Sequence, residues 1–413
     1  MNEAAKTANP AQQNVAMGKS WPERARRYRS FVIFTAAYLL IVQISVCVLT
    51  IPAASRGAAD FRQLYTAGYM ARSGHAGEIY DYDTSARIQS QIVSREDGAL
   101  PFNHLGYEAL VFVPLSLLKF RTAYFTFFAV NLALLAICLR LLRLWLKSTE
   151  DFWIELQLVP FLCFYPVTIA LIQGQDSIVL LTLMVAAFVS LERRRYGSAG
   201  FWLGLTAFKF QFTLPLLVLL LAWRRWKAAA FCALTGLTVA GCSIAITGGA
   251  VFSAYLRSLA SLGQGVAPGT QQRLWAIHPE AMPNLRGLAS VLSGAQDPHN
   301  LARWAVIGGT GLLLIWAARQ QPSFPLAVAV ALLVGYHGLI HDAAILVLPV
   351  CVLATKIQDP DPSSRGWAVL AAAALVITPT LLFLGHLSYS LMVFPIFATL
   401  AWLRIARNGL RPA

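Results

Sequence analysis

The sequence predicts an all-α protein, a polytopic transmembrane helical bundle of about twelve crossings with interfacial helices in its outer loops. Of its 413 residues, 57% are hydrophobic and 13% are charged, and the mean hydropathy is +0.59. A soluble globular protein carries about 25% charged residues, so this composition excludes a fully water-exposed surface. The apolar residues gather into long runs, and most basic residues lie between the runs. The net charge of +14 therefore indicates anionic membrane lipids as partners, and no nucleic acid is expected.

The first apolar run covers residues 31–51 and follows a polar tail, residues 1–30. About twenty helical residues span a bilayer core of about 30 Å, and without a cleavage site this run predicts an anchor rather than a cleaved signal. The tail ends in a basic cluster of Lys19, Arg24, Arg26, Arg27 and Arg29. Because basic segments stay inside, the N-terminus is predicted to be cytoplasmic and Asp60 to lie outside.

The remaining runs predicted to cross are residues 122–139, 152–172, 177–191, 199–208, 211–222, 228–247, 303–318, 324–336, 339–355, 367–384 and 388–403. With the first run, they make residues 31–405 one transmembrane domain and return the tail 406–413 to the cytoplasm. The other basic clusters then share the cytoplasmic side: Arg193, Arg194, Arg195, Arg224, Arg225, Lys227, Arg319, Lys356, Arg365, Arg404 and Arg407. The predicted location is a plasma membrane of bacterial type.

Two stretches fit this topology poorly because they are short. Residues 105–118 are either re-entrant or a crossing that shifts its neighbours. Residues 199–208 and 211–222 are short for two spans, and Lys209 lies between them. Broken helices persist in membranes only where protein or a water-filled cavity satisfies the backbone, so these stretches indicate a site.

Two long outer segments are predicted, residues 52–104 and 248–302. The first contains a helix from Asp60 to Arg72, in which Leu64, Tyr65, Gly68 and Tyr69 share one face, as expected for a helix lying in the interface. All seven histidines fall on the outer side: His75, His104, His278, His299, His337, His341 and His386. This titratable outer face is the predicted location of the reaction centre.

Asp60 is the candidate catalytic residue. A carboxylate held where a membrane helix emerges is costly to desolvate, and it could act as a general base that accepts a proton from an acceptor hydroxyl. The alternative is an N-cap for the following helix, a role that stabilises by about 1 kcal/mol.

The segment Gln173-Gly174-Gln175-Asp176 joins two apolar runs. Its glycine allows a tight reversal, and its two amides could donate to sugar hydroxyls. An ordinary interhelical turn capped by the aspartate is the alternative.

Lys209 lies within an otherwise apolar stretch. An unpaired cation there costs about 2.5 to 3.5 kcal/mol, so an anionic partner such as a lipid phosphate is expected. The alternative is that the side chain extends along the helix to the membrane surface.

His337 and His341 flank a predicted helix break and could hold a phosphate, or they could form a polar interfacial cap. The spacing is not that of an HExxH zinc peptidase, because Gly338 follows His337. Arg273, Arg286 and Asn284 of the second outer segment are further candidate contacts to phosphate or sugar.

Other motifs predict no additional chemistry. Asp81-Tyr82-Asp83 has the form of a metal-binding DxD motif, but a turn with solvated carboxylates is favoured because no nucleotide-binding sheet is predicted. The cysteines lack metal-ligand spacing and are interpreted as core residues: Cys47, Cys138, Cys163, Cys232, Cys242 and Cys351. GxSxG, Walker A and GxGxxG elements are absent in a suitable context.

Taken in order, these motifs resemble the polyprenyl-phosphate-sugar-dependent glycosyltransferases of family 87, of the membrane-embedded GT-C class, often described as mannosyltransferases. The resemblance runs from about residue 30 to residue 405. It rests on Asp60, Tyr65, Ala67, Gly74, Ile79-Tyr80, Phe102 through Pro114, Leu118, Gln173-Gly174-Gln175, Gly204 through Lys209, Pro215, Trp223-Arg224-Arg225, Asn284, Gly287, His341 and Pro349. Departures occur at Asn103 to Tyr107, where Tyr-Pro-Pro is frequent, at Asp176 in place of Asn, and at Arg286 in place of Ser.

The resemblance implies transfer of a hexose from a polyprenyl-phosphate donor to a lipid or glycan acceptor on the outer face. Mannose is the first candidate for this hexose. The reaction would be inverting, with Asp60 as base. Lys209, His341 and outer arginines would stabilise the leaving phosphate, so neither a metal nor a cofactor is expected. A transporter or flippase for a lipid-linked glycan and a non-catalytic scaffold are the competing interpretations, although the two-fold internal repetition usual in transporters is not seen.

Overall fold

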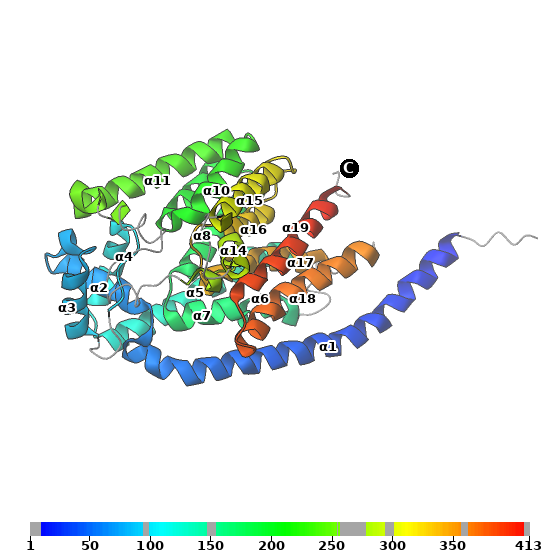
Figure 1. The fold of residues 1–413 in the computed structure, drawn as a ribbon. Coiled ribbons are helices and arrows are strands. Elements are labelled where there is room, and N and C mark those ends of the chain that lie inside the picture. Colours follow the sequence, from blue (N-terminus) through cyan, green and yellow to red (C-terminus); the bar gives the residue numbers. More distant parts are fainter. Residues whose placement is uncertain are drawn as a thin grey trace, which may run out of the picture.

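The computed structural model describes residues 10–93, 99–146, 154–253, 255–256, 278–293, 301–356 and 362–408. Within these ranges the secondary structure is helical and contains no strand, which confirms the predicted all-α class (Figure 1). The α-helices are α1 (Pro10–Ala53), α2 (Phe61–Arg72), α3 (Tyr82–Ile92), α4 (Gly106–Ser116), α5 (Phe120–Leu146), α6 (Ile154–Leu162), α7 (Tyr165–Gln173), α8 (Ser177–Glu192), α9 (Tyr196–Gly204), α10 (Phe210–Ala222), α11 (Trp226–Thr247), α14 (Leu285–Ser293), α15 (Leu301–Ala318), α16 (Phe324–Val334), α17 (Val347–Thr355), α18 (Pro362–Leu384) and α19 (Val393–Asn408). Short 3-10 segments cover Ala76–Glu78, Leu205–Lys209, Pro279–Ala281, Ile340–Leu346 and Tyr389–Met392, and a π-helical turn covers Ala54–Ala58.

The described helices include six segments long and apolar enough to cross a membrane, namely Val32–Arg72, Phe120–Arg143, Tyr196–Ala222, Trp226–Thr247, Leu301–Ala318 and Ser363–Leu384. Shorter apolar helices accompany them at Gln157–Gln173, Ser177–Glu192, Phe324–Val334, Ile340–Thr355 and Tyr389–Arg404. These segments identify an integral membrane protein, but they do not confirm the predicted number of twelve crossings.

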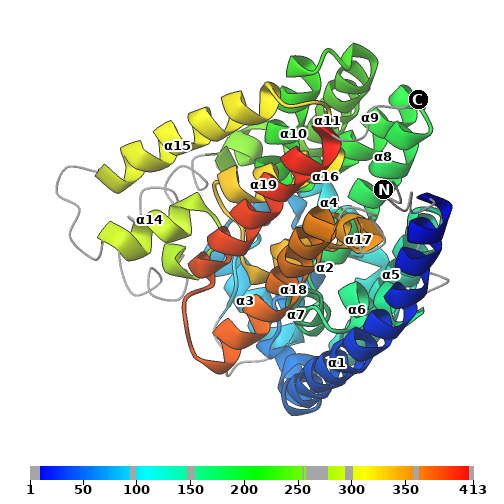
Figure 2. The same ribbon diagram turned by 90° about the vertical axis from the view of Figure 1, so that its right-hand side faces the viewer.

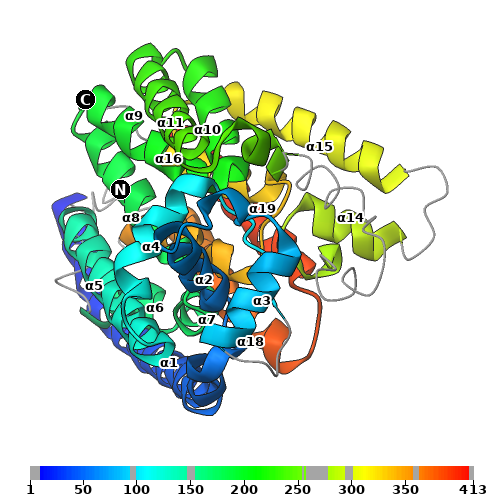
Figure 3. The same cartoon turned by 90° about the vertical axis from the view of Figure 1, so that its left-hand side faces the viewer.

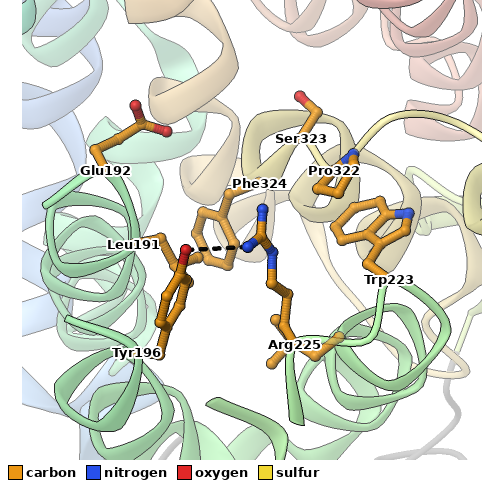
Figure 4. Close-up of a pocket in the computed structure, with 9 residues that line it drawn as sticks. Leu191, Glu192, Tyr196, Trp223, Arg225, Pro322, Ser323 and Phe324 are labelled. Atoms are coloured by element: carbon orange, nitrogen blue, oxygen red, sulfur yellow. Dashed lines mark hydrogen bonds between the residues drawn. The ribbon is translucent and has the colours of Figure 1, made fainter. Parts of the chain in front are cut away.

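Helices α9 and α10 form a hairpin rather than a straight span. Tyr196 and Arg225 are 29 residues apart, which would separate them by about 44 Å along one continuous helix. Instead, Arg225 Nη1 donates a hydrogen bond to Tyr196 Oη at 3.0 Å (Figure 4). The chain therefore turns back within Leu205–Lys209, with Lys209 near the tip. The nine residues of α9 reach only about 14 Å, less than a bilayer core of about 30 Å.

The hairpin brings basic residues from different parts of the sequence to one end of the molecule. Trp223 Nε1, beside Arg225, donates to the Ala317 carbonyl at 3.3 Å, and Arg319 follows two residues later. A small cavity lies here, lined by Leu191, Glu192, Tyr196, Leu220, Trp223, Arg225, Pro322, Ser323 and Phe324 (Figure 4). This contact is as expected if these basic clusters share a membrane face.

The helices of the first outer segment gather at the opposite end of the bundle. Figure 1 places α2 and α3 at one end, and the start of α1 and the end of α19 toward the other. Figure 2 faces the end with the start of α1, whereas Figure 3 shows α2, α3 and α4 in front.

Helix α4 corresponds to the short apolar stretch 105–118. Its 11 residues reach about 16 Å, roughly half of a bilayer core. It packs between α2 and α11, where Arg72 Nε donates to Ser116 Oγ at 3.0 Å and the Tyr107 N–H donates to Ser243 Oγ at 3.2 Å. Its length favours the re-entrant alternative.

Helix α2 is buried by protein on more than one face. Leu64, Tyr65 and Gly68 are buried as the helical spacing predicts, but Phe61 and Met70 are buried too. Burial of this segment therefore extends beyond the single face that the sequence pattern predicts, because α4 and other helices pack against it, and its position relative to the membrane surface stays a prediction. The helix begins at Phe61 rather than at Asp60.

Gly68 sets the close approach of α2 to α4. A Cβ atom at this position would lie 2.6 Å from both the carbonyl carbon and the carbonyl oxygen of Phe112. We expect Gly68→Ala to lower the free energy of unfolding by about 1 to 3 kcal/mol, because the backbones must separate. Thermal unfolding of the purified protein, followed by tryptophan fluorescence, measures the change. Gly77→Ala is the control, since nothing lies within 4 Å of its Cβ, and equal midpoints for the two variants would contradict the expectation.

Candidate functional site

Asp60 lies at the junction of α1 and α2 with its carboxylate turned toward another part of the chain. Gly57 adopts φ 126°, a conformation that suits glycine, and reverses the chain just before it. Asp60 occupies the N-cap position of α2, but its side chain makes no capping hydrogen bond. Instead, Asp60 Oδ2 accepts a hydrogen bond from Gln175 Nε2 at 2.7 Å, and the Asp60 N–H donates to Gln173 Oε1 at 3.0 Å. The capping alternative is therefore not realised.

The segment between α7 and α8 is the tight turn that the sequence predicts. Gly174 adopts the left-handed conformation, with φ 57° and ψ 44°. A Cβ atom there would lie 2.7 Å from Cβ of Phe61, the residue after Asp60. Glycine is therefore required both by the backbone conformation and by the close approach of the turn to the start of α2. This approach brings Asp60, Gln173 and Gln175 together.

Lys209 is buried near the tip of the α9–α10 hairpin, where two carboxylates flank its ammonium group. Lys209 Nζ lies 2.6 Å from Asp176 Oδ1 and 2.5 Å from Asp342 Oδ1, and it donates to Ser177 Oγ at 3.0 Å. The side chain is only 5% exposed, so it does not extend to the membrane surface. The anionic partners that the sequence leads us to expect are present as protein carboxylates, and contact with a donor phosphate stays a prediction.

Asp342 orders the 3-10 segment at the helix break as well as pairing with Lys209. Its Oδ1 accepts from Ser177 Oγ at 2.8 Å, and its Oδ2 accepts from the Leu339 N–H at 3.0 Å. Sequence reasoning missed this residue, although an acidic side chain beside His341 in an apolar run was an available signal.

His104 extends the buried network on the far side of Asp176. Its Nδ1 lies 2.9 Å from Glu108 Oε2 and 3.3 Å from Asp176 Oδ2. Burial opposes the imidazolium charge, but the Glu108 and Asp176 carboxylates outweigh it and raise the pKa of His104 to about 10. Burial raises the pKa of Glu108 to about 7 despite the attraction of His104. Burial also opposes ionisation of Asp176, yet Lys209 and His104 hold the pKa of that carboxyl well below its usual range.

Sequence reasoning did not select His104 and Glu108 as site residues. Their i, i+4 spacing at the start of α4 was the available signal, because residues four apart share a helix face. Two positions that the resemblance described above marks as departures, His104 and Asp176, are neighbours in space, with 3.3 Å between Nδ1 and Oδ2. The two departures therefore belong to one ionic cluster.

His337 lies within the break between the end of α16 at Val334 and the start of the 3-10 segment at Ile340, and His341 is the second residue of that segment. His341 is buried, with Nε2 3.6 Å from Asp342 Oδ2. Among the described residues, Nδ1 of His337 has no hydrogen-bond partner. Burial lowers the pKa of His337 to about 4, so this imidazole is neutral at physiological pH.

Arg286 and Asn284 tie the start of α14 to the same break. Arg286 Nη1 donates to the Tyr336 carbonyl at 3.1 Å, and its guanidinium carbon lies 4.3 Å from the centre of the Tyr336 ring. Asn284 is fully buried and bridges the Gly335 carbonyl, at 2.8 Å, and the Gly287 N–H, at 2.9 Å. Asn284 thus has a structural position, whereas Arg273 lies outside the described residues.

Two other features can be separated from this cluster. The carboxylates of Asp81 and Asp83 are exposed, and Asp81 Oδ2 caps α3 by accepting from the Thr84 N–H at 3.0 Å, which agrees with the predicted solvated turn.

The cavity in Figure 4 lies far from the ionic cluster. It includes Glu192, at the end of α8, whereas Ser177, at the start of α8, contacts Lys209. Sixteen helical residues place these points about 24 Å apart.

The described site therefore consists of a partly exposed carboxylate, Asp60, oriented by two amides and lying beside a buried ionic network. Such a carboxylate can accept a proton from a hydroxyl group, and the network can fix the polar groups around it.

Comparison with known proteins identifies the family. The family model of glycosyltransferase family 87 matches residues 108–349, well over half of the chain. No curated protein and no solved structure matches significantly. Lys209, Asp176, Asp342 and the helix break lie inside the matched segment, while Asp60 and His104 precede it. The chain belongs to glycosyltransferase family 87.

Proposed function

We propose that the protein transfers a hexose from a polyprenyl-phosphate donor to a lipid or glycan acceptor. Mannose is the first candidate for this hexose. Family membership supports sugar transfer, and the long apolar helices support a membrane location, which a lipid-linked donor requires. The reaction takes place at the end of the bundle that holds Asp60, on the outer face of a bacterial-type plasma membrane, with both termini cytoplasmic.

The observation that carries this proposal is the position of the Asp60 carboxylate. It is only partly buried, it leaves the helix N-terminus uncapped, and Gln175 Nε2 binds its Oδ2 at 2.7 Å. A capping or structural aspartate would direct its oxygens to the backbone N–H groups of α2. An orientation set by side chains from a distant turn is what a general base requires.

In the proposed step, one oxygen of Asp60 accepts the proton of the acceptor hydroxyl while that hydroxyl oxygen attacks the anomeric carbon. The bond from this carbon to the phosphate oxygen breaks on the opposite side, so the configuration inverts. The leaving group is a lipid phosphate monoester. Gln175 holds Oδ2, so we assign Oδ1 to the acceptor hydroxyl. The hydrogen bond from the Asp60 N–H to Gln173 Oε1 fixes the position of the Asp60 backbone for this contact.

The donor phosphate is assigned to the cationic and imidazole groups near the helix break. His341, His337 and Arg286 gather there, and Asn284 holds the Gly335 carbonyl in place. The Lys209 ammonium is already paired with two carboxylates. Its electrostatic attraction for the donor phosphate is therefore weaker than that of an unpaired lysine. Arg273 is proposed from its sequence position alone.

The donor class is tested with the purified wild-type protein in lipid vesicles. We expect transfer of labelled mannose from polyprenyl-phosphate mannose to lipid acceptors extracted from the native membrane. GDP-mannose, with the same sugar on a nucleotide, should give less than one hundredth of that rate. Transfer from GDP-mannose alone would overturn the proposed donor, and movement of the intact labelled lipid across the vesicle without transfer would support a flippase.

A further inference from the structure

The cluster of His104, Glu108 and Asp176 has the composition of a metal site. One nitrogen and two carboxylate oxygens from these residues all lie within 4.8 Å of one another, and all three residues are buried. His104 Nδ1 is 2.9 Å from Glu108 Oε2 and 3.3 Å from Asp176 Oδ2. Ligand atoms bound to a cation at about 2.0 to 2.2 Å are themselves separated by about 3 Å, so the two distances from His104 Nδ1 already match coordination spacing.

The carboxylate oxygens supply a second, independent observation. Among the described residues, Glu108 Oε2 and both carboxylate oxygens of Asp176 accept no hydrogen bond of suitable direction. Glu108 is 5% exposed and Asp176 is 2% exposed, so water does not satisfy them freely. Buried carboxylate oxygens are normally satisfied by hydrogen bonds or by metal coordination. Glu108 Oε2 and Asp176 Oδ2 are in ionic contact with His104 Nδ1, and Asp176 Oδ1 is in ionic contact with Lys209 Nζ.

The charges of the network also favour a further cation. Among the described residues of the network, three buried carboxylates (Glu108, Asp176 and Asp342) face two cationic groups, the Lys209 ammonium and the His104 imidazolium. Asp176 divides its oxygens, with Oδ1 2.6 Å from Lys209 Nζ and Oδ2 facing His104. A divalent cation would take the place of the imidazole proton and add one positive charge at that point.

We propose that His104 Nδ1, Glu108 Oε2 and Asp176 Oδ2 bind a divalent cation of the Mn²⁺ or Zn²⁺ class. An imidazole with two carboxylates suits these ions better than Ca²⁺, which takes oxygen ligands. Three protein ligands leave coordination positions for water or a phosphate oxygen. That the donor phosphate occupies such a position rests on the proposed function, and it differs from the metal-independent reaction that the family resemblance implies.

The test is direct metal binding to the purified full-length protein in nanodiscs after chelator treatment. Titration with Mn²⁺, followed by electron paramagnetic resonance, is expected to show one bound ion per chain. Pulsed spectra of that ion should show coupling to one imidazole nitrogen. Glu108→Gln and His104→Gln should each weaken binding at least tenfold, and His104→Gln should remove the nitrogen coupling. Zn²⁺ should displace the bound Mn²⁺, whereas Ca²⁺ should not.

The exposed pair His75 and Glu78 provides the matched control, since its nitrogen and oxygen lie 3.1 Å apart. Glu78→Gln should bind Mn²⁺ as the wild type does. The proposal is overturned if the wild type binds neither Mn²⁺ nor Zn²⁺, if bound Mn²⁺ shows no nitrogen coupling, or if Glu78→Gln weakens binding as much as Glu108→Gln. Metal binding and nitrogen coupling are both measured on the wild type, so a negative result cannot be attributed to misfolding of a variant. Because binding is measured without sugar transfer, its failure leaves the proposed transferase reaction standing.

Discussion

Asp60→Asn is expected to reduce the rate of sugar transfer at least a hundredfold. General base catalysis contributes about 10² to 10⁴ to a rate, and the amide cannot accept the proton of the acceptor hydroxyl at neutral pH. Asparagine has nearly the same shape, and its oxygen can still accept from Gln175 Nε2, which lies 2.7 Å from the present carboxylate. The measurement is initial transfer from labelled polyprenyl-phosphate mannose at saturating donor, with the enzyme amount fixed by quantified protein.

The control for Asp60→Asn is Asp83→Asn, which neutralises an exposed carboxylate in the first turn of α3. It should retain the wild-type rate. Donor binding by the Asp60 variant should stay within threefold of wild type, because the lost interaction belongs to the transition state. A variant that transfers sugar at the wild-type rate would show that another group removes the proton.

Lys209→Gln is expected to lower the free energy of unfolding by about 3 to 5 kcal/mol. Removing one partner of a buried ion pair leaves uncompensated charge, and here one ammonium serves two carboxylates, Asp176 and Asp342. Unfolding of the detergent-solubilised protein, measured by heat or by increasing denaturing detergent, gives the change. Lys119→Gln is the matched control because Lys119 is exposed, and it should change stability by less than about 0.5 kcal/mol.

The double variant Lys209→Gln with Asp342→Asn separates charge pairing from a phosphate-binding role. It removes one positive and one negative charge together, so it should recover part of the stability lost in the single variant. Donor affinity should recover with stability if Lys209 acts through its carboxylates. Wild-type stability in Lys209→Gln, combined with weakened donor binding, would instead identify Lys209 as a direct phosphate ligand.

Local features of the fold could be predicted from the sequence because they depend on local physics. The first apolar run lies within α1, Gly174 reverses the chain, and the break near Gly335 ends α16. The sequence predicts two runs, residues 199–208 and 211–222, with Lys209 between them, and α9 and α10 follow this division. Hydropathy alone does not exclude one continuous span, and the contact that excludes it joins Tyr196 to Arg225.

Part of the candidate site could likewise be predicted from the sequence, and part could not. The approach of Asp60 to Gln173 and Gln175 follows from three polar positions that the sequence already marks. The sequence pattern leaves Asp176 as a possible cap of a turn, and it did not single out Asp342, so their pairing with Lys209 was not apparent. That pairing depends on tertiary structure, because the lowest free energy for a buried ammonium is found beside whichever carboxylates the fold brings within reach.

The pairing of Lys209 also constrains how the protein is made. Asp176 is synthesised before Lys209, but Asp342 follows 133 residues later. When the hairpin first enters the membrane, its lysine has only one of its two carboxylates. The helix break that supplies the second must then dock against a tip already in place. Assembly of the bundle therefore includes an ion pair that forms late between early and late segments. A truncation before residue 342 should leave the hairpin exposed to membrane quality-control proteases.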